Sequence, residues 1–189
     1  MTHDHSVGTY PRFMPAERPA IPVELRRRLL VEAGHRCAIP TCRQTPVEFE
    51  HIEEWAKVQE HSFDNMIVLC PTCHARKGDR PGQIDRKSLR QYKANLATVN
   101  GRYGDLEQRL IWLYANALRR YPDDIGTMFN LPLGSAIQVL FLIQDGLLKQ
   151  ADPAPNEAYL WVHFTEAGRD FVERWSSALP LDEVTFAED

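Results

Sequence analysis

The placing of four cysteines constrains this chain more than any other feature of its sequence. All of them lie between positions 37 and 73, as Cys37-x4-Cys42 and Cys70-x2-Cys73. In a cytosolic chain, two such close pairs indicate a metal site rather than disulfides. Thiolates at short loop spacing can converge tetrahedrally on Zn²⁺. The pattern therefore predicts a structural zinc site, and the alternative is a set of reduced cysteines in a hydrophobic core.

Two absences in the sequence favour a cytoplasmic location. No apolar run approaches the ~20 residues that span a bilayer, and residues 1–22 contain no hydrophobic stretch of signal-peptide type. Residues 1–20 carry Pro11, Pro15 and Pro19 without any periodicity, so we expect a flexible N-terminal arm there.

Strands and helices are predicted on both sides of the cysteine pairs. Pro22 suits the first turn of a helix over about 23–33, and Gly34 suits its C-terminal end. Residues 47–52 alternate like a strand, and a polar loop over 53–64 follows. The predicted elements that come next are a short strand at 66–69, a helix at 71–77 and a longer helix at about 85–99.

The order of residues from Cys37 to His74 carries a resemblance to a known family. A cysteine pair is followed by Glu50-His51 on a strand, Asp64-Asn65 before a second strand, and Cys70-Pro-Thr-Cys-His74. Over about residues 23–80 this resembles the zinc-knuckle branch of the HNH endonucleases. That resemblance implies an α+β fold in which two antiparallel strands and a helix surround one catalytic metal ion.

The resemblance also implies a role for each matched residue. His51 corresponds to the general base that takes a proton from water, and a neutral imidazole suits that task. His74 corresponds to a metal ligand. Glu50 occupies a ligand position that is more often Asp or His in the family. Asn65 corresponds to the residue that holds the loop and orients the base. The implied cofactors are a structural Zn²⁺ and a catalytic Mg²⁺ or another divalent metal.

The implied substrate is DNA, with Arg76, Lys77 and Arg80 near its phosphate backbone. The family occurs in restriction and anti-phage defence, so the resemblance also implies the nuclease subunit of such a system. The alternative from another class is a zinc-stabilised module that binds nucleic acid or protein without turnover. His61 is interpreted as an ordinary loop residue.

Charge is divided unevenly along the chain. Residues 1–100 carry 15 Lys and Arg against 12 Asp and Glu, which gives +3, whereas residues 101–189 carry 7 against 14, which gives −7. A nucleic-acid surface therefore belongs to the first part. Because composition also changes at residues 100–104, we predict an arm over 1–20, a nuclease domain over 21–100 and a second domain over 101–189.

The predicted elements of the second domain resemble a winged-helix domain. They are a helix at 106–121, a short helix at 124–130, an apolar helix ending at Gly146, strands at 147–150 and 158–164, and a helix capped by Thr165. The helix that would read DNA spans 135–144 and has no basic residue. We therefore expect binding to a protein partner or self-association, with DNA reading or a plain core helix as the alternatives.

Overall fold

The computed structural model describes residues 18–123, 127–152, 154 and 158–181. Most of the predicted arm, residues 1–17, lies outside the described residues. Helices and strands are mixed, as the α+β prediction requires. The elements are α1 (Val23–Glu32), β1 (Glu48–His51), α2 (Trp55–Val58), β2 (Met66–Leu69), α3 (Pro71–Ala75), α4 (Arg86–Arg102), α5 (Asp105–Arg120), β3 (Met128–Pro132), η1 (Leu133–Val139), α6 (Leu140–Gln144), β4 (Leu148–Gln150), β5 (Tyr159–Phe164) and α7 (Glu166–Ser176).

The first part of the chain is built on the hairpin β1–β2. The two strands are antiparallel, with Glu50 opposite Ile67 and His51 opposite Met66. All four residues of β2 are buried, and β2 leads through Cys70 directly into α3. The cysteines pack with apolar side chains of the hairpin and of α4, including Ile52, Leu69 and Leu89. Burial of both faces of β2 fixes the register of the hairpin and therefore the place of α3.

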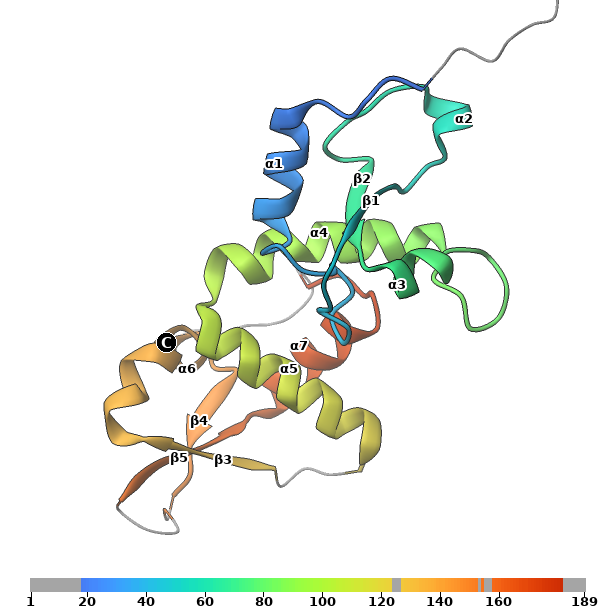
Figure 1. The fold of residues 1–189 in the computed structure, drawn as a ribbon. Helices are drawn as coiled ribbons and strands as arrows, with labels where there is room; N and C mark the ends of the chain where they lie inside the picture. The colour runs from blue at the N-terminus through green and yellow to red at the C-terminus, as the bar shows by residue number, and fades with distance from the viewer. Residues whose placement is uncertain (1–17, 124–126, 153, 155–157, 182–189) are drawn as a thin grey trace, which may run out of the picture.

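The second part is a three-stranded antiparallel sheet covered by helices. Its strand order is β3–β5–β4, and most of the other residues of its core come from α5, η1, α6 and α7. Figure 1 shows this sheet at one end of the molecule and the β1–β2 hairpin at the other. The helices and strands of the second part follow the predicted order except at the predicted short helix over 124–130. The winged-helix resemblance itself stays a prediction.

Helix α4 lies between the two parts and belongs to both cores. Leu89 and Leu96 pack with the cysteine cluster, whereas Val99 packs with the core of the second part. The helix continues past the predicted boundary at residue 100 and ends at Arg102 (Figure 1). Gly104 then caps α5, so only two residues separate the two long helices. The two parts are therefore joined by a rigid element and not by a loose linker.

Two local predictions for the second part have opposite outcomes. The Thr165 cap is confirmed, because its Oγ1 accepts a hydrogen bond from the Gly168 amide at 3.0 Å. The short helix predicted at 124–130 is wrong in its described part, residues 127–130, where strand β3 begins at Met128. That strand is formed by pairing with β5, which lies about thirty residues later and leaves no trace in the local pattern.

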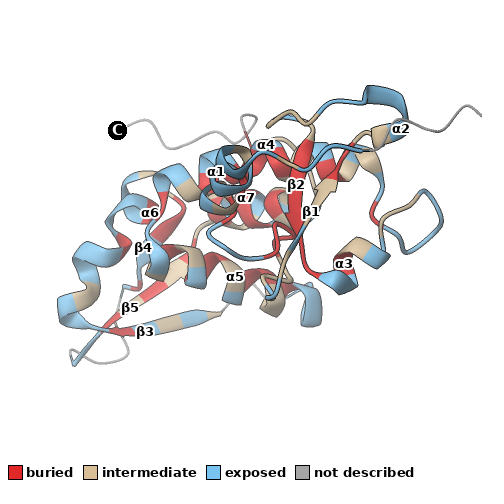
Figure 2. Ribbon diagram, turned by 45° about the horizontal axis from the view of Figure 1, so that its top comes forward, coloured by how far each residue is buried: buried red, intermediate tan, exposed pale blue. Residues whose placement is uncertain are grey.

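Strand β2 and the segment formed by η1 and α6 are at opposite extremes of exposure. Figure 2 shows β2 buried in the centre of the molecule and the segment formed by η1 and α6 largely exposed. This segment carries Ile137, 77% exposed, and Leu133, 57% exposed. Among the described helices, none has the length and apolar character needed to cross a membrane.

Candidate metal centres and active site

The four cysteines converge at the end of the β1–β2 hairpin. Their sulfur atoms all lie within 4.8 Å of one another, and all four are free thiols. The Cys42 and Cys70 sulfur atoms are 3.6 Å apart, which is far too long for a disulfide bond of about 2.05 Å. A tetrahedral Zn²⁺ with Zn–S bonds of about 2.3 Å places its sulfur ligands roughly 3.8 Å apart. The cluster therefore fits a structural zinc ion.

Burial explains why two of these thiols, Cys37 and Cys73, need a cation to be held as thiolates. It raises the pKa of Cys37 to about 11, because a thiolate inside a cluster of thiols is poorly solvated. Burial also raises the pKa of Cys73. A divalent metal ion offsets this cost and holds the sulfur atoms as thiolates. The cysteine prediction and the observed geometry thus agree on zinc.

A second group of polar side chains lies where β1 faces α3. Glu48 and Glu50 alternate along β1 and so point to the same face of the strand. His74, on α3, lies between them, with Nδ1 bound to the Glu48 carboxylate and Nε2 2.8 Å from Oε2 of Glu50. Glu48 was missed by the sequence analysis. Its spacing of two residues from Glu50 on a predicted strand is the signal that could have found it.

Lys77 closes one side of this group. Its ammonium donates to Oε1 of Glu50 and to the backbone carbonyl of His51, both at 2.5 Å, and only 15% of the side chain is exposed. Lys77 was predicted at a DNA phosphate, but the structure places it inside the site. A cavity of about 360 Å³ opens beside it, lined by Glu50, Glu54, His74, Lys77, Gly78, Asp79 and Arg86.

His51 lies on the other face of β1 and is almost completely buried, with 2% exposed. The Arg18 guanidinium donates to its Nδ1 at 2.7 Å, and its Nε2 lies 3.1 Å from Nδ1 of His61. Nε2 of His61 is 2.8 Å from the Pro19 carbonyl oxygen. The ring of Trp55 packs against both histidines. His61 is therefore a direct partner of the predicted base, not an ordinary loop residue.

These contacts determine where the protons lie. A guanidinium only donates, so Nδ1 of His51 must accept, and a carbonyl only accepts, so Nε2 of His61 must donate. The remaining proton then lies on Nε2 of His51 and points to His61. Burial, and next the positive charge of Arg18, lower the pKa of His51. The ring is thus neutral at pH 7, with Nδ1 as its lone-pair nitrogen.

Asn65 ties the two ends of the intervening loop together. Its Oδ1 accepts from the Glu53 amide at 2.8 Å, and its Nδ2 donates to the Glu53 carbonyl at 3.0 Å. The Ile52 amide donates to the Asn65 carbonyl at 2.8 Å, which extends the pairing of the two strands. These three bonds fix the backbone immediately after His51, as expected of a loop-holding asparagine.

The order and geometry of these residues agree with a comparison against known families. Residues 35–80 match the HNH endonuclease family. We refer to this matched segment below as the HNH domain. It covers about a quarter of the chain and contains every residue of the motif from Cys37 to His74. No curated protein and no solved structure matches the chain significantly.

The HNH domain offers two ligand atoms for a catalytic divalent ion. Oε2 of Glu50 and Nε2 of His74 are 2.8 Å apart, and two neighbouring ligands of an octahedral ion with bonds of about 2.1 Å lie roughly 3.0 Å apart. Glu48 holds the opposite ring nitrogen of His74, as carboxylates commonly do behind a metal-bound histidine. The residues therefore fit the metal that HNH nucleases use.

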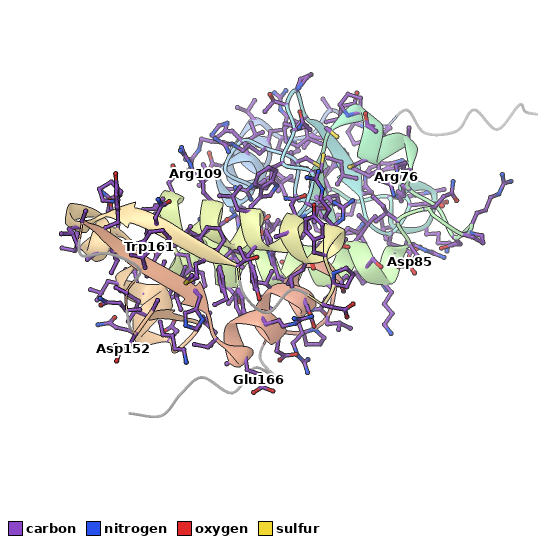
Figure 3. The ribbon with its side chains drawn as sticks, turned by 90° about the horizontal axis from the view of Figure 1, so that it is seen from below. Arg76, Asp85, Arg109, Asp152, Trp161 and Glu166 are labelled. Atoms are coloured by element: carbon purple, nitrogen blue, oxygen red, sulfur yellow. The ribbon has the colours of Figure 1, made fainter. Side chains whose placement is uncertain are left out.

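The two arginines predicted to contact DNA and the neighbouring Arg86 are arranged in two ways. Arg86 donates to Glu53 at 2.7 Å and lines the cavity at Glu50. The side chains of Arg76 and Arg80 are exposed, and that of Arg76 donates to the Gly82 carbonyl at 3.2 Å. The structure thus brings Lys77 into the group of Glu50 and His74 and leaves Arg76 and Arg80 on the surface of the turn that follows α3 (Figure 3 labels Arg76).

Proposed function

We propose that the chain is an endonuclease that hydrolyses DNA phosphodiester bonds in its HNH domain. The observation that carries this proposal is the state of His51. Its ring is buried, neutral and hydrogen-bonded on both sides, and its lone pair lies on one defined nitrogen. A general base needs a lone pair on a defined nitrogen and a fixed direction.

His51 would act through Nδ1, the nitrogen that Arg18 now covers. Water must replace the guanidinium there before it can give up a proton. A phosphate group competes well for a guanidinium, because the two form paired, charge-assisted hydrogen bonds. Substrate binding would therefore draw Arg18 away from the base and hold it at the phosphate. His61 would keep the ring in the tautomer that leaves Nδ1 unprotonated.

Glu50 and His74 would hold the divalent metal, and Glu48 would orient His74. When bound, such an ion would stabilise negative charge on the departing 3′-oxygen. Cleavage of the bond to that oxygen would leave a 5′-phosphate. Lys77 and the metal ion would compete for the Glu50 carboxylate. The Lys77 ammonium would therefore shift toward solvent or substrate when the ion binds. Arg76 and Arg80, exposed beside the site, would contact the phosphate backbone of DNA.

Plasmid cleavage by a matched set of variants tests the proposal. His51→Ala should fold, keep its zinc and lose about 10²- to 10⁴-fold in Mg²⁺-dependent nicking, the usual contribution of a general base. His35→Asn is the control, because His35 is exposed and has a left-handed backbone that asparagine accepts. Undiminished cleavage by His51→Ala would contradict the assignment.

One observation favours the alternative of a binding module without turnover. Both groups needed for catalysis are engaged by internal cations, Arg18 at His51 and Lys77 at Glu50. The same assay separates the two functions, since a binding module retains DNA but gives no nicked product with any divalent metal.

For residues 101–189 we propose a winged-helix-like domain that binds a protein partner or a second copy. The strand order β3–β5–β4 and the exposed apolar side chains of η1 and α6 support this role. The boundaries proposed for the two domains remain 21–100 and 101–189. The assignment to a defence or restriction system rests on the HNH resemblance.

A further inference from the structure

A cavity of about 280 Å³ lies between the first cysteine pair and helix α5, apart from the HNH site. It is lined from the segment around Cys42 by Arg36, Arg43 and Gln44, and from α5 by Asp105, Gln108, Arg109 and Trp112. Its volume approaches the lower end of the range for small-molecule sites. It shares no lining residue with the cavity at Glu50 and His74. Figure 3 shows Arg109 well apart from Arg76, which follows α3.

Positive charge in this cavity is only partly balanced. Arg109 is paired with Asp105 at 2.6 Å. Neither Arg36 nor Arg43 forms an ion pair with any carboxylate of the described residues; Arg43 donates instead to the neutral Gln108 amide oxygen at 3.3 Å. Two neighbouring guanidinium groups that have no ion-paired carboxylate among the described residues leave a place for an anion.

A second observation, independent of charge, concerns a buried hydrogen-bond donor in the wall of this cavity. The indole N–H of Trp112, a residue of the cavity wall, is buried and has no hydrogen-bond partner among the residues that the structure describes. Buried donors are nearly always paired in native proteins, so an orphan donor calls for an explanation. An oxygen-rich anion would accept bonds from the guanidinium groups, and it would reach the indole N–H only after a small shift of the cavity wall, because that nitrogen is closed to solvent.

The backbone conformation at Arg43 restricts where its side chain can lie. Its φ of +55° lies in the left-handed region, which long side chains seldom adopt. The conformation is kept by the loop around it, because the Cys37 amide donates to the Gln44 carbonyl at 3.0 Å. A bound zinc ion at Cys42, the preceding residue, would make this loop stiffer still. Residues held in such conformations are commonly found at binding sites.

We propose that this cavity is a phosphate-binding site, formed by Arg36 and Arg43 with Trp112 and Gln108. Guanidinium groups match phosphate oxygens with paired hydrogen bonds, which makes a phosphate the anion that best fits two arginines. The phosphate can belong to a free nucleotide or to a DNA backbone that continues beyond the HNH site. The inference concerns a separate cavity and does not depend on cleavage.

Direct binding to the zinc-loaded full chain tests this site. The probes are inorganic pyrophosphate, a 5′-mononucleotide and a short DNA duplex, titrated without added divalent metal. The double variant Arg36→Gln/Arg43→Gln should weaken binding of at least one probe by about 10- to 100-fold, as expected from lost charge-assisted bonds. Arg119→Gln/Arg120→Gln is the matched control, because it removes the same charge from the exposed far end of α5.

The pattern across the probes identifies the source of the phosphate. Weakened binding of the nucleotide and pyrophosphate assigns the cavity to a small ligand, and weakened binding of the duplex alone assigns it to the DNA backbone. Trp112→Phe, which keeps the aromatic volume and removes the N–H, should weaken the same probe by a smaller factor. Equal affinities in the double variant and the control, or no binding of any probe to the native chain, would overturn the proposal. Neither result bears on cleavage, which the His51→Ala variant tests.

Discussion

At the scale of single residues, the proposed base is held by partners that its sequence motif does not contain. The sequence predicts His51 from its place after Glu50, but its lone pair is placed by Arg18 and His61. Both partners come from segments without a recognisable pattern, a proline-rich stretch and a polar loop. Glu48 was missed because a glutamate on a half-exposed strand is ordinary unless its neighbour across the site is known.

His61 should therefore affect the rate of cleavage through the direction of the His51 ring. His61→Ala removes the acceptor for Nε2 of His51 and should lower the nicking rate by about 10- to 100-fold, the cost of a misplaced catalytic group. His61→Gln can still accept and donate, and should recover much of the loss. Initial rates of plasmid nicking measure the effect, and equal rates for the alanine and native proteins would disprove the role.

At the scale of elements, short-range patterns were predictable and long-range pairings were not. The hairpin at the cysteines and the Thr165 cap follow from alternation and from local hydrogen bonding. Strand β3 depends on β5, and the last turn of α4 depends on packing that overrides Asn100 and Gly101. There Asn100 donates its side-chain amide to the Glu32 carbonyl, so a residue that usually ends helices is kept inside one.

Glu107 joins α5 to α6 through two backbone amides. Its carboxylate is 2% exposed and accepts from Gly104 at 2.7 Å and from Leu142 at 3.0 Å. Glu107→Ala leaves both donors unpaired at helix starts and should cost about 2–4 kcal/mol in the free energy of unfolding. Urea denaturation measures this loss. Gln91→Ala, on a neighbouring helix, serves as a control with only one side-chain bond to lose.

Asp145 should make stability depend on acid pH. Burial raises its pKa, but hydrogen bonds from Arg102 and Tyr103 outweigh that effect and leave the pKa below its usual value of 3.8. The stabilisation is therefore present above about pH 4 and is lost as the pH falls through the folded-state pKa. Asp145→Asn should cost about 1–2 kcal/mol at pH 7, discounted for the exposure of Arg102.

Urea denaturation at pH 7 and near pH 3 tests this expectation, because the difference between Asp145→Asn and the native protein should shrink in acid. Asp170→Asn is the control, since its pairing with Arg174 is exposed. A loss of equal size at both pH values would show that the carboxylate charge is not responsible.

At the scale of the whole molecule, the cysteine cluster stabilises more than its own loops. Apparent free energies of about 10–16 kcal/mol for structural zinc exceed or match the stability of a typical domain. The first part of the chain, which contains the cysteine cluster, should therefore lose its fold when the zinc ion is removed. Helix α4 should be affected as well, because Leu89 and Leu96 pack in that core.

Metal analysis and circular dichroism test this in a single protein preparation. We expect one zinc ion per chain and, after strong chelation, a loss of helical signal and a lower melting temperature. Cys73→Ser should reproduce the effect of the chelator. Full helical content and an unchanged melting temperature after complete removal of zinc would contradict it and favour four reduced core cysteines.

Helix α4 also limits which insertions the sequence can accept during evolution. Adding one residue between Leu96 and Val99 would rotate everything after it by about 100° and shift it by about 1.5 Å. Because each end of the helix is already packed in a different core, neither half could absorb that turn. Insertions tolerated in an ordinary interdomain linker should thus be excluded here, and the two halves should keep one fixed spacing wherever this pair of domains occurs.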